Sequence, residues 1–580
     1  MRKSSTLCVL VAGVTASALF AQSPPQNASA TPQVSAPTIK VETRVVLVDI
    51  VVTGAKGQPI VNLKKDDFRI AEDGVPQSLS SFEEHKLDRS QPMVLPAMPA
   101  NVYTNFPAAK PPDSVNVLLL DMLNTQPSNQ AYVREQALKY LSGAPAGTRV
   151  AIFALHRQLH LVRGFTTDFS GLAAALDDKS LSARPEVSPF LSTDSTKASE
   201  NEILRAMTRN MSSPVKIDAV RDYEADRLAE MNRSRADITL EALQALAHFL
   251  SAMPERKNVI WFADSFPVSF LPDPKVHDAK RQALVQQTSD LLTAGQVAIY
   301  PVSASGLVGD PGFQANNDRG PRERQSAESG PEAEQIAMET IAQDTGGRAF
   351  YRRNGLSDAF ATAVNEGAQY YTLAYSPTDV RNDGKYRRIE VTIPASDYKL
   401  AYRRGYFADK PLASAADGAS NQDPLIPYIG FGLPDFDKII CKVEVSPTSP
   451  QPKKGAARAG ANTELKEPVV RYGVNFAISV DDLALTAAAD GARHGHLEEM
   501  VAAYDAEGRI LNLAKQEMKL SMGEQDYLKL RAIGLQLHQE IDVPPGEVIL
   551  RVGIYDFDSG NAGTIGIPVS SPTPRQKAKH

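Results

Sequence analysis

Val115-Asn116-Val117-Leu118-Leu119-Leu120-Asp121-Met122-Leu123-Asn124-Thr125 is the stretch that decides the fold of this chain. A short, unbroken apolar run between polar residues is typical of a strand that helices cover on both faces. The strand ends at Asp121, and Asn124 and Thr125 then lead into a predicted helix. Because ligands of open α/β sheets bind at the carboxyl ends of strands, we expect Asp121 and Thr125 at the functional edge.

Strand and helix signals alternate from residue 115 to about residue 407, which predicts a parallel sheet with helices on both faces. Residues 259–264 and 297–302 are predicted to be two further buried strands. Residues 149–155 and 159–162 are too close for a crossover helix, so they predict an antiparallel pair at a sheet edge. The expected fold is therefore a doubly wound, Rossmann-like α/β domain.

Composition and the amino terminus indicate an exported protein of several domains. The chain has 580 residues, which is too long for one core, and its net charge of −6 with no basic patch predicts no nucleic-acid partner. Met1-Arg2-Lys3 precedes an apolar run over residues 6–20, and small residues follow, which predicts a secretory signal over residues 1–21. The signal is too short for a stable span, so we expect a periplasmic or secreted protein without a transmembrane segment.

The remaining chain divides by composition and by periodicity. Alternating apolar residues over 472–480 and 548–554 predict a half-buried antiparallel sandwich of immunoglobulin-like type. The expected order is a disordered linker (22–39), a small β domain (40–85), a Pro-rich linker (86–113), the α/β domain (114–407, with a polar insertion at about 177–235), a linker (408–429), the β-sandwich (430–570, with a disordered loop at 446–468) and a tail (571–580).

Motifs of catalysis are missing from the sequence. It contains no G-x-S-x-G, H-E-x-x-H, Walker loop or G-x-G-x-x-G after a strand, so we do not predict an enzyme. The stretch 556–561 begins like a calcium loop, but Ile567 occupies its twelfth position, so a turn is predicted there. His494 and His496 are expected in a solvated loop next to Glu498 and Glu499, and a weak adventitious metal site there is the less favoured alternative.

Oxygen-bearing residues at the sheet edge form a candidate metal site. A hard cation such as Mg²⁺ prefers oxygen ligands and keeps some of its water. Asp121, Thr125, Thr239 at an expected helix start, and Asp264 at a strand end could supply such ligands if the two strands are neighbours. The helix amino termini at this edge would also favour an anionic ligand. The sequence therefore predicts a site for Mg²⁺, or for Mn²⁺ or Ca²⁺.

The central region resembles a von Willebrand factor A domain, whose metal-ion-dependent adhesion site uses D-x-S-x-S, a distant Thr and a distant Asp. More specifically, the chain resembles the secreted VWFA-related proteins typical of Acidobacteria over about residues 40–407. The segments that carry the resemblance are 67–68, 72–74, 117–121, 123–125, 239–243, 256–261, 370–377 and 404–406.

The resemblance implies an exported binding protein that meets a protein or cell-envelope partner at the carboxyl edge, where the partner's carboxylate completes the metal shell. The motif here is Asp121-Met122-Leu123-Asn124-Thr125, so Leu123, which cannot bind a metal, stands in the place of the middle Ser. Asn124 is the auxiliary ligand in this interpretation. Two alternatives remain open: a metal-free structural or assembly module of the envelope, and, less favoured, a hydrolase.

Overall fold

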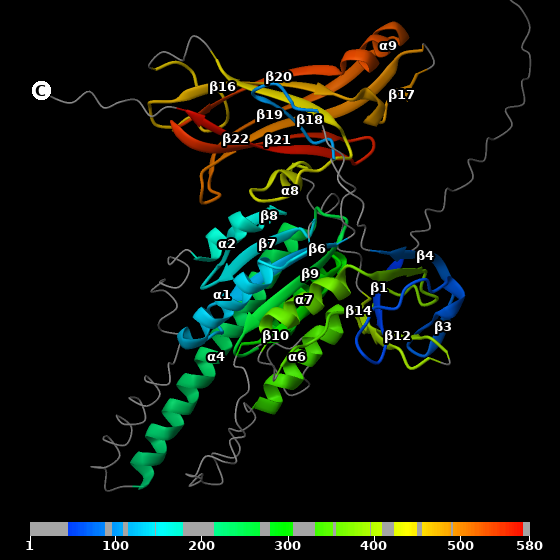
Figure 1. Ribbon diagram of the computed structural model, residues 1–580, viewed down its shortest axis with the longest axis vertical. Helices are drawn as coiled ribbons and strands as arrows, with labels where there is room; N and C mark the ends of the chain where they lie inside the picture. The colour runs from blue at the N-terminus through cyan, green and yellow to red at the C-terminus, as the bar shows by residue number, and fades with distance from the viewer. Residues whose placement is uncertain are drawn as a thin grey trace, which may run out of the picture. The chain divides into compact units, whose positions relative to one another are not determined.

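The computed structural model describes residues 44–86, 96–107, 114–145, 147–177, 214–266, 279–304, 331–351, 355–394, 396–408, 423–448, 455–488 and 491–571 (Figure 1). The expected signal (1–21), the linker 22–39, most of the insertion, most of the linker 408–429 and residues 572–580 of the tail lie outside these residues. Within the described ranges, no helix is both long enough and apolar enough to cross a membrane.

The predicted parallel sheet is present, and the apolar run that ends at Asp121 forms its central strand. Its order is β10-β9-β6-β7-β8, with four parallel strands and an antiparallel β8 at the edge, as the close spacing of the last pair predicted. The strands are β6 (Ser114–Asp121), β7 (Val150–Leu155), β8 (Leu159–Thr166), β9 (Arg256–Ala263) and β10 (Val297–Ser303).

Helices cover both faces of this sheet. Because successive side chains of a strand point to opposite faces, Val117 and Leu119 pack into one core, and Leu118 and Leu120 pack into the other. The first core is closed by α4 (Pro214–Leu250), α5 (Ala279–Ala294) and α6 (Pro331–Thr345), and the second by α1 (Pro127–Leu141), α2 (Phe169–Asp177) and α7 (Leu356–Gly367). Burial on both faces explains why four consecutive residues of β6, at positions 117–120, are all apolar.

Helix α4 corrects one expectation about the site. Thr239 was expected at a helix start, but it lies inside this 37-residue helix, which already begins at Pro214. The Thr239 hydroxyl donates to the carbonyl of Arg235, one turn earlier, with a separation of 2.8 Å. A threonine can satisfy its hydroxyl in this way within a helix, so Thr239 needs no capping role there.

Two further four-stranded sheets form an antiparallel β domain, and they correct the expected domain limits. Residues 370–407 were placed in the α/β domain, but β11 pairs with β1 and β4, and β12 pairs with β2. Periodicity identifies a strand but not its partner, which explains the error. The orders are β13-β1-β11-β4 and β14-β12-β2-β3. The strands are β1 (Val46–Thr53), β2 (Arg69–Glu72), β3 (Val75–Gln77), β4 (Leu79–His85), β11 (Tyr370–Tyr375), β12 (Tyr386–Thr392), β13 (Lys399–Ala401) and β14 (Gly405–Phe407), with a 3₁₀ turn at η1 (Lys65–Asp67).

The carboxy-terminal region is also built from two antiparallel sheets, with orders β20-β16-β15-β5 and β17-β18-β21-β22, and β19 pairs with β18. The Pro-rich linker contributes β5, which pairs with β15, so this linker is not only a connection. Its elements are β5 (Val102–Thr104), α8 (Ile426–Ile429), β15 (Cys441–Pro447), β16 (Val470–Ile478), η6 (Val480–Asp482), β17 (Thr486–Ala487), β18 (Arg493–Tyr504), β19 (Ile510–Met522), α9 (Glu524–Ile533), β20 (Leu535–Val543), β21 (Gly546–Asp556) and β22 (Ala562–Ser571).

The structure also corrects two expectations about loops of the carboxy-terminal region. Part of the loop expected to be disordered is held in place, since the Ala459 amide donates to Asp542 at 2.9 Å. His494 and His496 were expected in a solvated loop, but both lie within β18, and the neighbouring Glu498 and Glu499 lie in the same strand and are buried. By contrast, the turn predicted after Asp556 is present, and the Asp556 carboxylate accepts from the Ser559 hydroxyl at 2.7 Å.

Glu499 lies on the face of β18 that packs into the core between the two sheets. Its neighbours on that face, Leu497 and Val501, belong to the core cluster, and Glu499 itself is 1% exposed. Neither carboxyl oxygen has a hydrogen-bond partner among the described residues. Burial therefore raises the pKa of Glu499 to about 7, because the charged form loses its hydration without compensation.

This burial predicts that the carboxy-terminal region loses stability as the pH rises. The pKa of Glu499 is about 7 in the fold against 4.5 for an ordinary glutamate. Below pH 4.5 Glu499 is protonated in both the folded and the unfolded chain, and its contribution to stability is complete. Between pH 4.5 and pH 7 only the unfolded chain releases this proton, so the contribution is lost across that window. The free energy of unfolding should fall by about 3 kcal/mol across that window. We expect Glu499→Gln to remove this part of the pH dependence in calorimetry at pH 5 and pH 8. An equal change in both proteins would contradict the prediction.

Candidate functional site

The carboxyl ends of β6 and β9 define the crevice where a doubly wound sheet binds ligands. These strands are neighbours and run parallel, and the chain continues from β6 to β7 on one side and from β9 to β10 on the other. The order of strands therefore reverses between them, which is the usual position of a binding site. Asp121 is the last residue of β6, and Asp264 directly follows β9.

Asp121 is buried and fully engaged by hydrogen bonds. Its Oδ1 accepts from the Asn124 amide at 2.8 Å, and its Oδ2 accepts from Asn124 Nδ2 at 2.7 Å and from Trp261 Nε1 at 2.9 Å. The residue is 1% exposed. Burial raises the pKa of Asp121 to about 6, although these hydrogen bonds act in the opposite direction.

Asn124 connects Asp121 to helix α4. Its Nδ2 also donates to Thr239 Oγ1 at 3.0 Å, and its Oδ1 accepts from Arg235 Nε at 3.0 Å. Both hydrogens and the oxygen of this side-chain amide are therefore used inside the protein. Asn124 was expected to be an auxiliary metal ligand, but in this geometry it is the centre of a hydrogen-bond network.

Arg235 brings a permanent positive charge to the two carboxylates. Its Nη2 donates to Ser265 Oγ at 2.9 Å, so the guanidinium reaches from α4 to the loop after β9. Its charge acts to lower the pKa of both Asp121 and Asp264, against the larger effect of burial. Sequence reasoning missed Arg235, although it lies four residues before Thr239 and thus on the same face of a helix.

Asp264 caps helix α1. Its Oδ2 accepts from the Gln126 amide at 2.6 Å, and both carboxylate oxygens accept from Asn129 Nδ2 at 2.9 and 3.0 Å. A carboxylate at the start of a helix satisfies an amide that lacks an internal partner and interacts favourably with the helix dipole. Burial raises the pKa of Asp264 from its ordinary value.

The structure brings the predicted residues together, but not as a set of free ligands. The Asn124 carbonyl accepts from the Asp264 amide at 3.0 Å, which joins both strand ends in one network. Thr125 is 2% exposed, and its carbonyl accepts from Gln130 Nε2 at 3.0 Å. Leu123, in the place of the middle Ser, is fully buried in the core cluster that contains Trp261.

This arrangement does not fit a divalent cation well. Such an ion needs several oxygen lone pairs directed at one point. Here the Asp121 oxygens accept three hydrogen bonds, and the Asn124 amide lies between Asp121 and Thr239. The part of the chain that the structure describes contains no group of three His, Cys, Asp or Glu residues placed to hold a metal. The oxygen atoms of this site already accept hydrogen bonds, including those from the guanidinium of Arg235, and so suit that guanidinium better than an added ion.

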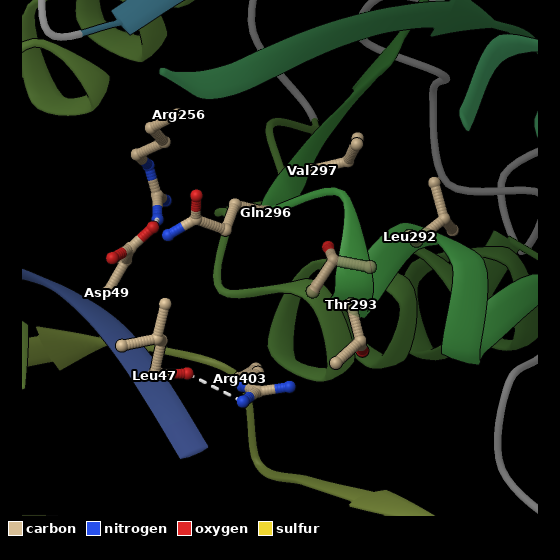
Figure 2. Close-up of a pocket in the computed structure, with 9 residues that line it drawn as sticks. Leu47, Asp49, Arg256, Leu292, Thr293, Gln296, Val297 and Arg403 are labelled. Atoms are coloured by element: carbon tan, nitrogen blue, oxygen red, sulfur yellow. Dashed lines mark hydrogen bonds and ion pairs between the residues drawn. The ribbon is translucent and has the colours of Figure 1, made fainter. Parts of the chain in front are cut away.

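At its amino end, β9 is tied to β1 by a buried ion pair. Arg256 Nη1 lies 3.5 Å from Asp49 Oδ2, and the two side chains are 3% and 7% exposed. Asp49 also accepts from the Thr372 hydroxyl at 2.7 Å, and Arg256 donates to the Gly346 carbonyl at 2.9 Å. Figure 2 shows Asp49 and Arg256 pointing toward each other, beside Gln296.

The cavity beside this ion pair is small. Its volume of about 30 Å³ is enough for a single water molecule. Arg403 also lines it and donates to the Leu47 carbonyl at 2.6 Å, the dashed contact in Figure 2. The ion pair and the Arg403 contact join β1 to the parallel sheet. The cavity beside them is too small to hold an organic ligand.

Comparison with known proteins gives only weak similarities. No protein-family profile matches the chain, and no curated protein matches it. Among solved structures, an aerotolerance-related membrane protein from Bacteroides fragilis is 13% identical, with 43% of this chain and 98% of that chain covered and a TM-score of 0.23. BatB from Bacteroides thetaiotaomicron is 14% identical, with coverages of 44% and 98% and a TM-score of 0.21.

A von Willebrand factor type A protein from Catenulispora acidiphila is 11% identical, with 51% of this chain and 65% of that chain covered and a TM-score of 0.22. All three TM-scores lie below 0.5. The fold described above therefore rests on its own strand order and packing.

Proposed function

We propose that this chain is an exported binding protein with a von Willebrand factor A-like domain, which meets a protein or cell-envelope partner at the carboxyl edge of its parallel sheet. The observation that supports this is the network of Asp121, Asn124, Thr239 and Asp264 at the β6–β9 crevice. It lies where the strand order reverses, and it uses the positions at which the resemblance implies an adhesion site.

In this proposal the carboxyl edge of the parallel sheet binds its partner without a divalent cation. The guanidinium of Arg235 supplies the positive charge that a metal would bring, and Asn124 links it to Asp121. The network fixes the loops after β6 and β9, so the edge is pre-organised for a partner. Mg²⁺, Mn²⁺ or Ca²⁺ would have to displace hydrogen bonds that are already made.

The burial of Asp121 and the hydrogen bonds made by the Asp121 and Asp264 carboxylates favour a binding role over catalysis. A general base must reach the proton that it removes. Asp121 is 1% exposed and both its oxygens accept hydrogen bonds, while Asp264 caps a helix. Export is proposed from the predicted signal over residues 1–21. The alternative, a metal-free structural module of the envelope, uses the same residues but needs no partner at this edge.

Site-specific photo-crosslinking in cells tests the proposal. A photoreactive amino acid at Pro127, an exposed position at the start of α1, lies next to the edge. The control is Lys139, an exposed position at the other end of the same helix. We expect a discrete adduct from position 127 only, and we expect it to persist in EDTA. Identical adducts from both positions, no adduct at 127, or loss of the adduct in EDTA would contradict the proposal.

A further inference from the structure

A second cavity, far larger than the one beside the ion pair, lies between β13, α6 and the segment that follows α6. Its volume is about 450 Å³, within the range of about 300–1,000 Å³ that is typical of ligand sites. Its lining includes Leu400 of β13 and Ala349, which precedes Phe350. It shares none of the residues of the carboxyl-edge network.

Strand β13 presents an open edge to this cavity. It is the outer strand of its sheet, and its other side pairs with β1 through Val51, Val52 and Thr53. The Val52 carbonyl accepts from Ile60 at 2.9 Å, so the polar groups of Val52 face away from β13. Because hydrogen-bonded pairs alternate along an antiparallel ladder, the amide and carbonyl of Leu400, opposite Val52, point outward from the sheet.

A second strand edge faces the same space. Phe350 bridges to β10, since its amide donates to Pro301 at 2.8 Å and its carbonyl accepts from Ser303 at 2.9 Å. Because the amide and carbonyl of successive residues in an extended chain point to opposite sides, those of Ala349 point away from β10. Ala349 lines the cavity, and its backbone makes no hydrogen bond within the described residues.

The charges around the cavity favour an acidic occupant. Lys399 and Arg404 line it, and neither makes an ion pair with a carboxylate in the described part of the chain. The acidic residues there already have partners. Glu366 pairs with Arg348 at 2.9 Å, and Glu339 accepts from the Tyr351 hydroxyl. Three cations (Arg348, Lys399 and Arg404) and two carboxylates therefore line the cavity, which leaves one positive charge in excess. Asp344 lies near Arg404, but burial raises the pKa of Asp344 to about 7, so its carboxylate offsets little of that charge.

We infer that this cavity is a groove for an extended acidic peptide, which adds as a strand to the Leu400 edge of β13 and places carboxylates near Lys399 and Arg404. Strand addition gives affinity through main-chain hydrogen bonds, and alternate side chains give specificity. A carboxylate that meets an unpaired cation forms a charge-assisted hydrogen bond. This site is separate from the proposed carboxyl-edge site and does not depend on it.

The test uses the full chain and a fluorescein-labelled heptapeptide, Thr-Val-Glu-Val-Glu-Val-Thr, followed by anisotropy at low salt. We expect saturable binding that Lys399→Glu weakens by about tenfold, the loss of one charge-assisted contact. The matched control is Lys442→Glu, an exposed lysine on β15 with the same change of charge. It should leave the affinity unchanged, and hydrogen exchange should show new protection at the Leu400 amide.

Two altered peptides separate strand addition from simple charge attraction. A peptide with Gln in place of Glu should bind about as weakly as the wild-type peptide binds to the Lys399→Glu protein. A peptide with Pro at its centre, which lacks the required amide, should lose binding. The inference is overturned by absence of saturable binding at millimolar peptide, by equal loss in the two lysine variants, or by full binding of the Pro peptide.

Discussion

Replacing Arg235 with alanine is expected to lower the free energy of unfolding of the α/β domain by about 1–3 kcal/mol, the cost of leaving a buried acceptor without its donor. The substitution leaves Asp121 buried without the nearby positive charge and leaves Asn124 Oδ1 without its donor. Trp261 is the single tryptophan of the chain and donates to Asp121, so its fluorescence reports unfolding at this site. Urea denaturation followed by this signal measures the loss.

Two further variants make this result specific. Arg233 lies on the same helix and forms an exposed pair with Glu230 at 3.0 Å, so Arg233→Ala should cost less than about 1 kcal/mol. Arg235→Lys keeps the charge but loses the fixed geometry of the guanidinium, so an intermediate loss is expected. If Arg235→Ala and Arg233→Ala were equally stable, the role assigned to Arg235 would be wrong.

Replacing Asp49 with alanine is expected to cost more, about 3–5 kcal/mol, because it leaves the guanidinium of Arg256 buried without its carboxylate. Asp66→Ala is the matched control, since Asp66 is exposed and its loss should change stability by less than about 0.5 kcal/mol. Urea denaturation followed by Trp261 fluorescence again measures the change, because β9 carries both Arg256 and Trp261.

A double variant separates the ion pair from its surroundings. Removing both partners, as Asp49→Leu with Arg256→Met, leaves neither member of the pair as an unpaired charge, so part of the lost stability should return. The recovery should be incomplete, because Asp49 also compensates the charge of Arg403. The prediction fails if the double variant is as unstable as the sum of the two single variants.

The sequence predicted strands and their burial better than it predicted their partners. The apolar runs located β6, β9 and β10, because burial on both faces leaves a signal within each strand. Nothing local indicates that β11 pairs with β1, more than three hundred residues earlier in the chain. The antiparallel edge of the parallel sheet was predictable because a short connection excludes a crossover.

The sequence predicted where the candidate site lies, but it did not predict which interactions the side chains make there. Asp121 and Asp264 follow apolar strands, so their position at one edge could be deduced from the strand order expected for the fold. Leu123 was a visible departure from the adhesion motif. Arg235 was missed because it lies in a polar stretch that was interpreted as the end of an insertion. Only the continuity of α4 shows that this stretch brings a cation to Asn124.

The measurement that tests the central claim most directly is denaturation of the full chain, followed by Trp261 fluorescence, in EDTA and then in millimolar Mg²⁺, Mn²⁺ or Ca²⁺. An ion that binds only the folded state raises the midpoint as its concentration exceeds its Kd. If Arg235 takes the place of the cation, the wild-type midpoint should be the same under all these conditions. A cation-dependent rise in the wild type that disappears in Asp121→Ala would contradict the account and would establish a metal site at this edge.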